Sequence, residues 1–376
     1  MNRLLLQCAL TLLLIAVLLS PVYSAASEST QNHAVILTYH RIGEDNLPDE
    51  NLTIEQFTTH IHEIKTGGYN VLPLTTILED FETGTLLPPH TIAITFDGAH
   101  KSALENAVPL LLKAKLPFTI FYAALNLDQE DPASANWNDL KKLAKNKNIT
   151  LASLPTSYNH IAYKTRTEML TALNEARRRH REEFGHETPY LAYPFGEYSL
   201  ALKDLAKTQG FKAAFGLHSG AIDATSDRFA LPRFSMTEHY GDLERFRLVT
   251  RAIPLTVTDI EPPDPDLKTA PFFTGFTLPD ALASKSKNLS CFISGEGRAK
   301  TEILGNRIEI REDTGLLDND RIRLNCTLPG PLSENDEPQW YWLGLLYFRS
   351  SQPDELQRPQ EQNASTYSQY PSSKSP

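Results

Sequence analysis

The sequence predicts an α/β barrel followed by a small all-β domain. Nearly continuous apolar strands alternate with helical segments along the first two thirds of the chain, and about seven such units in roughly 230 residues favour a barrel over an open sheet. Beyond a proline-rich stretch the helical period disappears. Short strands are then separated by Gly, Asn and Asp clusters, which is typical of a β-sandwich.

The barrel elements follow from the spacing of apolar residues. Strands are expected where these residues run on for about four to eight positions, and helices where they recur every three to four residues. The expected strands are 35–40, 71–74, 91–96, 118–124, 149–154, 190–193, 213–217 and 231–234. The expected helices are 54–64, 75–81, 103–115, 137–145, 166–184, 200–209 and 243–253.

The domain limits follow from changes in composition. Four prolines between residues 259 and 271 predict a stiff, extended connector. The expected segments are a signal peptide at 1–26, the barrel at 33–258, a proline-rich linker at 259–275, a β-sandwich at 276–349 and a disordered tail at 350–376. The sandwich strands are expected at 289–294, 301–311, 321–328 and 340–348.

The amino terminus and the cysteines indicate an exported protein, either periplasmic or secreted. A basic start, an apolar run over 4–19 and small residues after it predict a signal peptide. A membrane anchor is the alternative, but the run is shorter than the roughly 18 to 20 apolar residues that a span needs. Cys291 and Cys326 would then form a disulfide contributing roughly 3 to 4 kcal/mol, with two buried thiols as the alternative.

The charge balance bears on the partners of the protein. Acidic residues outnumber basic ones by 46 to 36, and the formal net charge is −10. This argues against nucleic acid or an anionic membrane as the partner, because both require a concentrated basic surface. The basic run at 177–181 is followed by Glu182 and Glu183, so we interpret it as a solvated helix face.

The segment from Thr91 to Ser102 is the strongest candidate for a functional site. Its apolar strand ends at Asp97, and Gly98 lets the backbone turn into the next helix. The carboxyl ends of strands are where α/β proteins carry their chemistry, so Asp97 is a candidate catalytic residue. A carboxylate that caps the following turn is the alternative.

This segment resembles the first motif, Thr-Phe-Asp-Asp-Gly-Tyr, of the polysaccharide deacetylase family (NodB homology, carbohydrate esterase family four). The resemblance spans roughly residues 35 to 266. It implies a distorted (β/α)7 barrel and a hydrolase that removes acetyl groups from a polysaccharide of N-acetylated sugars. It also implies a divalent metal, Zn²⁺, held by one Asp and two His, with Asp97 in the position of the catalytic base.

The family's metal ligands are replaced in this sequence. The second Asp of the first motif falls on Gly98, and the ligand histidines of the second motif, His-Thr-x-Ser-His-Pro-His-Leu, fall on Leu154 and Tyr158. His100 and His160 are alternative ligands near the barrel mouth, the end of the barrel where the carboxyl ends of its strands lie. We favour the alternative that His100 packs the turn and His160 hydrogen-bonds loop backbone, because metal sites tolerate little displacement of ligands.

Residues 190–198 resemble the third family motif, Arg-x-Pro-Tyr-Gly, which forms a wall of the substrate groove. The candidate substrate-binding residues in this segment are Tyr193, Pro194, Phe195 and Gly196. A sharp strand-to-helix turn would use the same proline and glycine. His40, after the first strand, is a further substrate-binding candidate, with a buried core histidine as the alternative.

Two further features remain open. Residues 254–259 contain no histidine where other family branches carry the general acid, and His218 is the nearest candidate for a proton donor. The aromatic run at 340–342 could stack on sugar rings, although we favour a sandwich strand with both faces covered.

The sequence therefore supports two main functions. The first is a hydrolase of the N-acetyl amide bond in an envelope or exported N-acetylhexosamine polymer. The second is a pseudo-enzyme that binds carbohydrate or assists polysaccharide assembly, which the replaced ligands favour. A third possibility is an interaction module that works through the β-sandwich.

Overall fold

The structure is a computed structural model that describes residues 32–44, 46–267, 272–312, 321–333 and 336–350. The chain divides into two units, Met1–Asn32 and His33–Pro376. The predicted signal peptide at 1–26 and the predicted tail beyond residue 350 lie outside the described residues and stay predictions. In the described ranges, no helix is both long enough and apolar enough to span a bilayer.

A curled sheet of mainly parallel strands forms the barrel. Its strands are β1 (His33–Tyr39), β4 (Asn70–Val71), β5 (Thr91–Asp97), β6 (Phe118–Tyr122), β7 (Ile149–Ser153), β8 (Tyr190–Ala192), β9 (Ala213–Phe215), β10 (Ala221–Asp223) and β11 (Phe234–Ser235). The order is β10-β1-β5-β6-β7-β8-β9, parallel from β1 to β9. A bridge from Phe215 to Leu231 and the pairing of β11 with β1 bring the two sheet edges together, which confirms a distorted α/β barrel.

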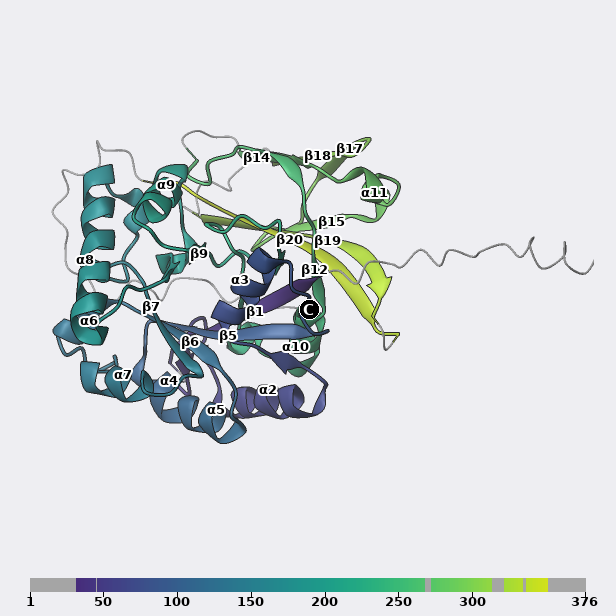
Figure 1. Cartoon of the computed structure of the whole chain (residues 1–376). Coiled ribbons are helices and arrows are strands. Elements are labelled where there is room, and N and C mark those ends of the chain that lie inside the picture. Colours follow the sequence, from purple (N-terminus) through teal and green to yellow (C-terminus); the bar gives the residue numbers. More distant parts are fainter. Residues whose placement is uncertain (1–31, 45, 268–271, 313–320, 334–335, 351–376) are drawn as a thin grey trace, which may run out of the picture. The chain divides into compact units, whose positions relative to one another are not determined.

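Helices cover the outside of this sheet, as Figure 1 shows for α2, α5, α7 and α8 around β5, β6 and β7. The helices are α2 (Ile54–Thr66), α3 (Leu74–Thr83), α4 (Lys101–Asn106), α5 (Val108–Ala114), α6 (Ala124–Asp128), α7 (Trp137–Leu143), α8 (Arg166–Phe184), α9 (Leu200–Thr208) and α10 (Leu243–Thr250). Helix α8 has the predicted bounds, because Thr165 forms a capping box and Gly185 ends the helix at a φ of 79°.

Two predicted helices have different bounds. The predicted helix 103–115 is interrupted at Ala107, where α4 ends and α5 begins, and Pro109 in the first turn of α5 has no amide hydrogen to continue α4. The predicted helix 243–253 ends at Thr250. Its last residues form the strand β12 (Ala252–Pro254), because they pair with the distant strand β20 (Pro338–Phe348).

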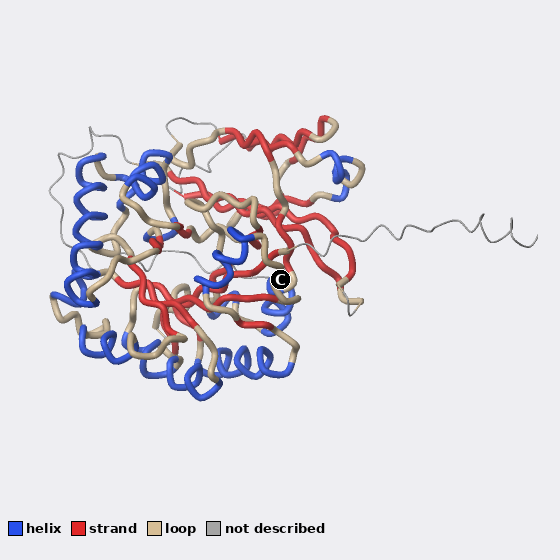
Figure 2. Tube along the Cα trace, viewed as in Figure 1, coloured by secondary structure: helices blue, strands red, loops and turns tan. Residues whose placement is uncertain are grey.

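Strands dominate the chain after the barrel, as Figure 2 shows. The remaining elements are β13 (Thr258–Glu261), β14 (Phe272–Thr277), α11 (Asp280–Ala283), β15 (Ser290–Ile293), β16 (Gly297–Arg298), β17 (Thr301–Leu304), β18 (Arg307–Glu312) and β19 (Arg321–Leu332). They form two sheets, β12-β20-β19-β15-β16 and β13-β14-β18-β17, which share an apolar core. The predicted linker at 259–275 contains most of β13 and the start of β14, which pair across it.

The predicted disulfide is present in this second part of the chain. Cys291 on β15 lies directly opposite Cys326 on β19, and their sulfur atoms are 2.02 Å apart. The bond therefore joins neighbouring strands of one sheet.

Strand β20 packs on two cores at once. Tyr341, Leu343, Leu345 and Tyr347 pack with the core that the two sheets share. On the opposite face, Trp342 joins the barrel core and packs edge-on against Phe234 with ring centroids 5.1 Å apart. Because side chains alternate along a strand, Tyr341 and Trp342 cover opposite faces of β20 as core residues, whereas Trp340 is only partly buried.

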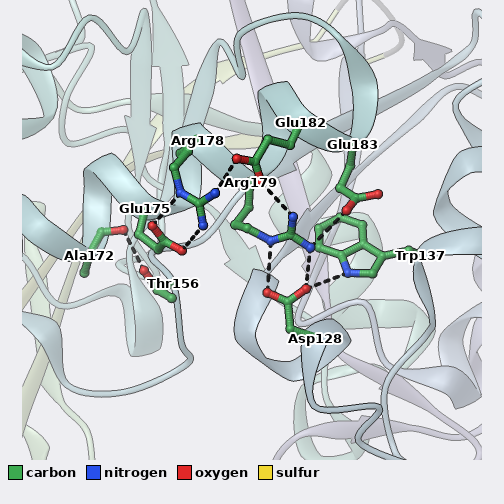
Figure 3. A network of polar contacts seen from close by, with 9 residues as sticks. All are labelled: Asp128, Trp137, Thr156, Ala172, Glu175, Arg178, Arg179, Glu182 and Glu183. Carbon is green, nitrogen blue, oxygen red and sulfur yellow. Dashed lines mark hydrogen bonds and ion pairs between the residues drawn. The ribbon is translucent and has the colours of Figure 1, made fainter.

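The basic run at 177–181 forms ion pairs, and Figure 3 shows those of Arg178 and Arg179. Arg178 pairs with two glutamates of its own helix. The Arg179 side chain is only 17% exposed, pairs with Asp128 of α6 and lies 5.0 Å from the ring centroid of Trp137 of α7. The expected solvated face is therefore wrong for Arg179, which joins three helices.

We predict that Trp342→Ala lowers the free energy of unfolding by about 3 to 5 kcal/mol, because it empties a large volume between β20 and the barrel. Urea titration of the purified protein measures this loss. Trp340→Ala, on the same strand but only partly buried, is the matched control with a smaller expected effect. Equal losses in the two variants would contradict the assignment of Trp342 to the barrel core.

Candidate functional site at the barrel mouth

Asp97 ends β5 and forms a buried ion pair with Arg233. The two carboxylate oxygens accept hydrogen bonds from the two terminal guanidinium nitrogens, each at 2.7 Å, and both side chains are 0% exposed. The Nε of Arg233 donates to the Gly216 carbonyl at 3.0 Å, and the guanidinium lies over the rings of Phe121 and Phe215. Bidentate pairing of this kind holds a carboxylate charged and fixed in orientation.

Arg233 is a site residue that the sequence analysis did not single out. The sequence feature that could have identified it is an arginine inside the apolar segment 231–234. A buried arginine requires a partner of opposite charge. Within the described ranges, the hydrogen bonds of the Asp97 carboxylate come from Arg233 and none comes from the backbone of the following turn.

The turn after Asp97 has an unusual backbone. Gly98 has a φ of 98° and Ala99 a φ of 49°, both in the left-handed region that non-glycine residues rarely adopt. The turn carries the His100 ring back onto Gly98, where a Cβ atom would lie 2.4 Å from Nε2 of His100. The imidazole thus fills the space in which a side chain at position 98 would begin.

At this mouth His40 is buried and His100 is half-buried. Burial lowers the pKa of His40 despite the opposing charge of Asp97, and burial together with the charge of Arg41 lowers the pKa of His100 well below its ordinary value. Both imidazoles are therefore neutral at pH 7. The Nδ1 atom of each ring has no hydrogen-bond partner in the described part of the chain.

The two histidine positions of the second family motif hold side chains in different environments. Leu154 is fully buried in an apolar cluster with Phe121 and Ala152. Tyr158 contacts the ring of Phe195, with centroids 4.8 Å apart. Burial, and to a lesser extent the charge of Asp97, raises the pKa of the Tyr158 hydroxyl, so this residue stays a protonated phenol.

His160 lies at the more exposed side of the mouth. Its Nδ1 is 2.7 Å from Oε2 of Glu197, a carboxylate that is 1% exposed, whereas the His160 side chain is 43% exposed. The ring stacks on Phe195 and Tyr163 at centroid distances of 4.2 and 4.9 Å. The expectation that His160 hydrogen-bonds loop backbone is therefore wrong, because its partner is a buried carboxylate.

The third motif forms the short 3₁₀ turn η2 (Pro194–Gly196). Phe195 has a φ of 57°, and Gly196 is required because a Cβ atom there would lie 2.2 Å from the Leu217 amide nitrogen. Tyr193 is fully buried, and its hydroxyl donates to the Phe229 carbonyl. Pro194 and Gly196 are also buried, while Phe195 is partly exposed. The roles of these four residues and of His40 in substrate binding stay predictions.

His218, the candidate proton donor, is buried near the same turn. Its Nε2 is 3.1 Å from the Ala230 carbonyl oxygen, and burial lowers its pKa to about 4. The ring is neutral at pH 7 and is poorly suited to protonate a leaving amine.

The residues present do not fit the metal centre that the family resemblance implies. In the described ranges, no three His, Cys, Asp or Glu side chains lie close enough together to hold a metal ion. The alternative ligands do not rebuild one, since His160 is bonded to Glu197 and His100 lies against Gly98. A catalytic zinc site needs three protein ligands.

The fold and the strand-end site are those of a NodB-type deacetylase barrel. Residues 86–214 match the sequence model of the family described as polysaccharide deacetylase. This match confirms the resemblance to the polysaccharide deacetylase family that the three motifs carry.

Curated relatives extend this assignment along the chain. The chain is 22% identical over 233 residues to the poly-β-1,6-N-acetyl-D-glucosamine N-deacetylase of Staphylococcus aureus, covering 55% of this chain and 80% of the relative. The same enzyme of Staphylococcus epidermidis is 21% identical, with 54% and 78% covered.

Solved structures show the same fold. A Streptococcus pyogenes deacetylase in complex with acetate superposes with a TM-score of 0.54 at 16% identity, covering 59% of this chain and 99% of that one. A de-N-acetylase from Aggregatibacter actinomycetemcomitans gives a TM-score of 0.52 at 15% identity, with 57% and 98% covered.

We predict that Asp97→Asn lowers the free energy of unfolding by about 3 to 5 kcal/mol, because it leaves the Arg233 guanidinium buried without a counter-charge. Chemical denaturation of the two proteins measures the loss. Asp204→Asn removes a carboxylate from an exposed pair with Arg166 and should cost less than about 1 kcal/mol. A small loss in both variants would show that Asp97 is not held as described.

We predict that stability falls as the pH drops from 7 to 4, partly through His218. Its folded pKa of about 4 lies below the ordinary value near 6.5, so the unfolded chain takes up the proton at a higher pH than the folded protein does. Between pH 7 and pH 4 this difference lowers the free energy of unfolding by up to about 3 kcal/mol. His218→Gln should flatten the dependence of unfolding free energy on pH, whereas His62→Gln, at an exposed helix position, should not. An unchanged slope in His218→Gln would contradict the prediction.

Proposed function

We propose that this chain is an exported carbohydrate-binding protein of the polysaccharide deacetylase family. Its ligand would be an envelope or exported polymer of N-acetylated hexosamines, bound at the barrel mouth without metal-dependent removal of acetyl groups. The observation that carries this proposal is the set of residues at the ligand positions. Gly98 has no side chain, Leu154 is buried among apolar groups, and Tyr158 is a protonated phenol.

Three features support retained binding at the mouth. The curated relatives are named for poly-β-1,6-N-acetyl-D-glucosamine, which supports a polymer of this chemistry as the ligand. Ala99 and Phe195 keep left-handed backbone conformations on two sides of the mouth, a strain that functional sites often retain. Phe195 is a partly exposed ring beside it, suited to contact a sugar face.

The export of the protein is part of this proposal. The disulfide between Cys291 and Cys326 supports an oxidising compartment, since such bonds persist mainly in periplasmic and secreted proteins. The predicted signal peptide at 1–26 points the same way.

Hydrolysis of the N-acetyl amide bond is the second candidate function. It is favoured by Asp97, which stands at the position of the family's catalytic base and is held in orientation by Arg233. The carboxylate is 0% exposed, however, so a water or an amide carbonyl reaches it only after the mouth rearranges. In the described ranges, no group of His, Cys, Asp or Glu side chains is placed to hold the metal that would polarise the amide carbonyl.

We expect the mature protein to bind β-1,6-linked N-acetylglucosamine oligomers without releasing acetate when Zn²⁺ or Co²⁺ is added. Calorimetry measures binding, and an enzymatic assay measures free acetate. Phe195→Ala should weaken binding about tenfold by removing the partly exposed ring, whereas Phe273→Ala, at an exposed site on β14, should leave it unchanged.

Two outcomes would change the conclusion. Metal-dependent acetate release, lost in a folded Asp97→Asn variant, would establish the hydrolase. Absence of binding to several N-acetylated polymers would contradict both candidates and favour a role that does not use the mouth.

A further inference from the structure

The His100 imidazole stands where the family's metal-ligating side chain would have to begin. An ideal Cβ atom on Gly98 would lie 2.4, 2.8 and 3.0 Å from Nε2, Cδ2 and Cε1 of His100. Two of these distances are shorter than real Cβ contacts, and all three atoms belong to one rigid ring. Any side chain at position 98 therefore requires this ring to move.

The backbone on both sides of His100 is held in place. The Gly98 amide donates to the Phe121 carbonyl at 2.8 Å, and the Ala99 carbonyl accepts from the Ala135 amide at 2.9 Å. The Lys101 amide donates to the Ala133 carbonyl at 2.9 Å. These bonds tie the turn to β6 and to the loop before α7, so the ring has little freedom to leave by a backbone shift.

The surroundings of the ring also resist its displacement. His100 is half-buried and lies near His40 and Arg41. The replaced ligand positions Leu154 and Tyr158 belong to packed apolar and aromatic contacts.

We propose that His100 acts as a plug that occupies the space of a side chain at position 98, so that restoring the three family ligands is not sufficient to create metal binding while His100 remains. The proposal rests on the proposed function, because it gives the structural reason for a metal-free mouth. It assigns to His100 a role of excluding divalent cations.

A metal titration tests the plug directly. One variant restores the family ligands through Gly98→Asp, Leu154→His and Tyr158→His, and the second adds His100→Ala. We expect the second variant to bind Zn²⁺ at least about tenfold more tightly than the first in calorimetric titrations. Equal Zn²⁺ affinity in the two variants, or tight binding by the first, would overturn the proposal.

A double-mutant cycle keeps the proposal testable where the multiple variants fail to fold. Gly98→Ala should shift the urea midpoint strongly downward in the native background and less in a His100→Ala background. The strain of alanine at a φ of 98° is common to both backgrounds and cancels in the comparison. Equal shifts would show that His100 does not occupy this space.

These readouts separate the plug from the proposed function. Metal affinity and stability do not depend on a sugar ligand. A failed polymer-binding experiment combined with a positive metal titration would therefore remove the proposed ligand and keep the plug.

Discussion

The buried pair of Asp97 and Arg233 is the interaction on which the barrel mouth depends. The two residues are 136 positions apart, and their pairing joins the end of β5 to the segment that leads into β11. Taking two charges out of water costs several kcal/mol for each, and this cost is offset by two hydrogen bonds at 2.7 Å, a further bond to the Gly216 carbonyl and the rings of Phe121 and Phe215. The pair thereby fixes the place where the edges of the curled sheet meet.

The strands after the barrel also support the mouth. Arg321 of β19 donates to the Phe195 carbonyl, and Phe348 of β20 stacks on Tyr163 with ring planes 8° apart. Tyr163 in turn stacks on His160. The second set of sheets is therefore continuous with the barrel in its packing, and Trp342 and Phe348 of β20 belong to the core where the two parts meet.

At the turn after β5 the chain keeps the family fold but differs from the family motif at a ligand position. Asp97 and its arginine partner are present, yet the next residue is a glycine whose missing side chain is replaced in space by the His100 ring. A fold can persist when its site residues change, because the barrel core is built from other side chains. His40 and His100 are neutral imidazoles at this mouth, whereas the family's metal centre includes a carboxylate ligand.

The sequence by itself determined the order of the barrel elements, the bounds of α8, the Cys291 to Cys326 pairing and the loss of the family's ligands, because these depend on local patterns and residue types. Tertiary structure alone decided the rest. Strand β12 exists because it pairs with β20, almost 90 residues later in the chain, and Arg233 finds Asp97 only across the folded barrel. The position of the His100 ring depends on two consecutive residues, Gly98 and Ala99, in the left-handed region. An alanine in the sequence does not predict that conformation.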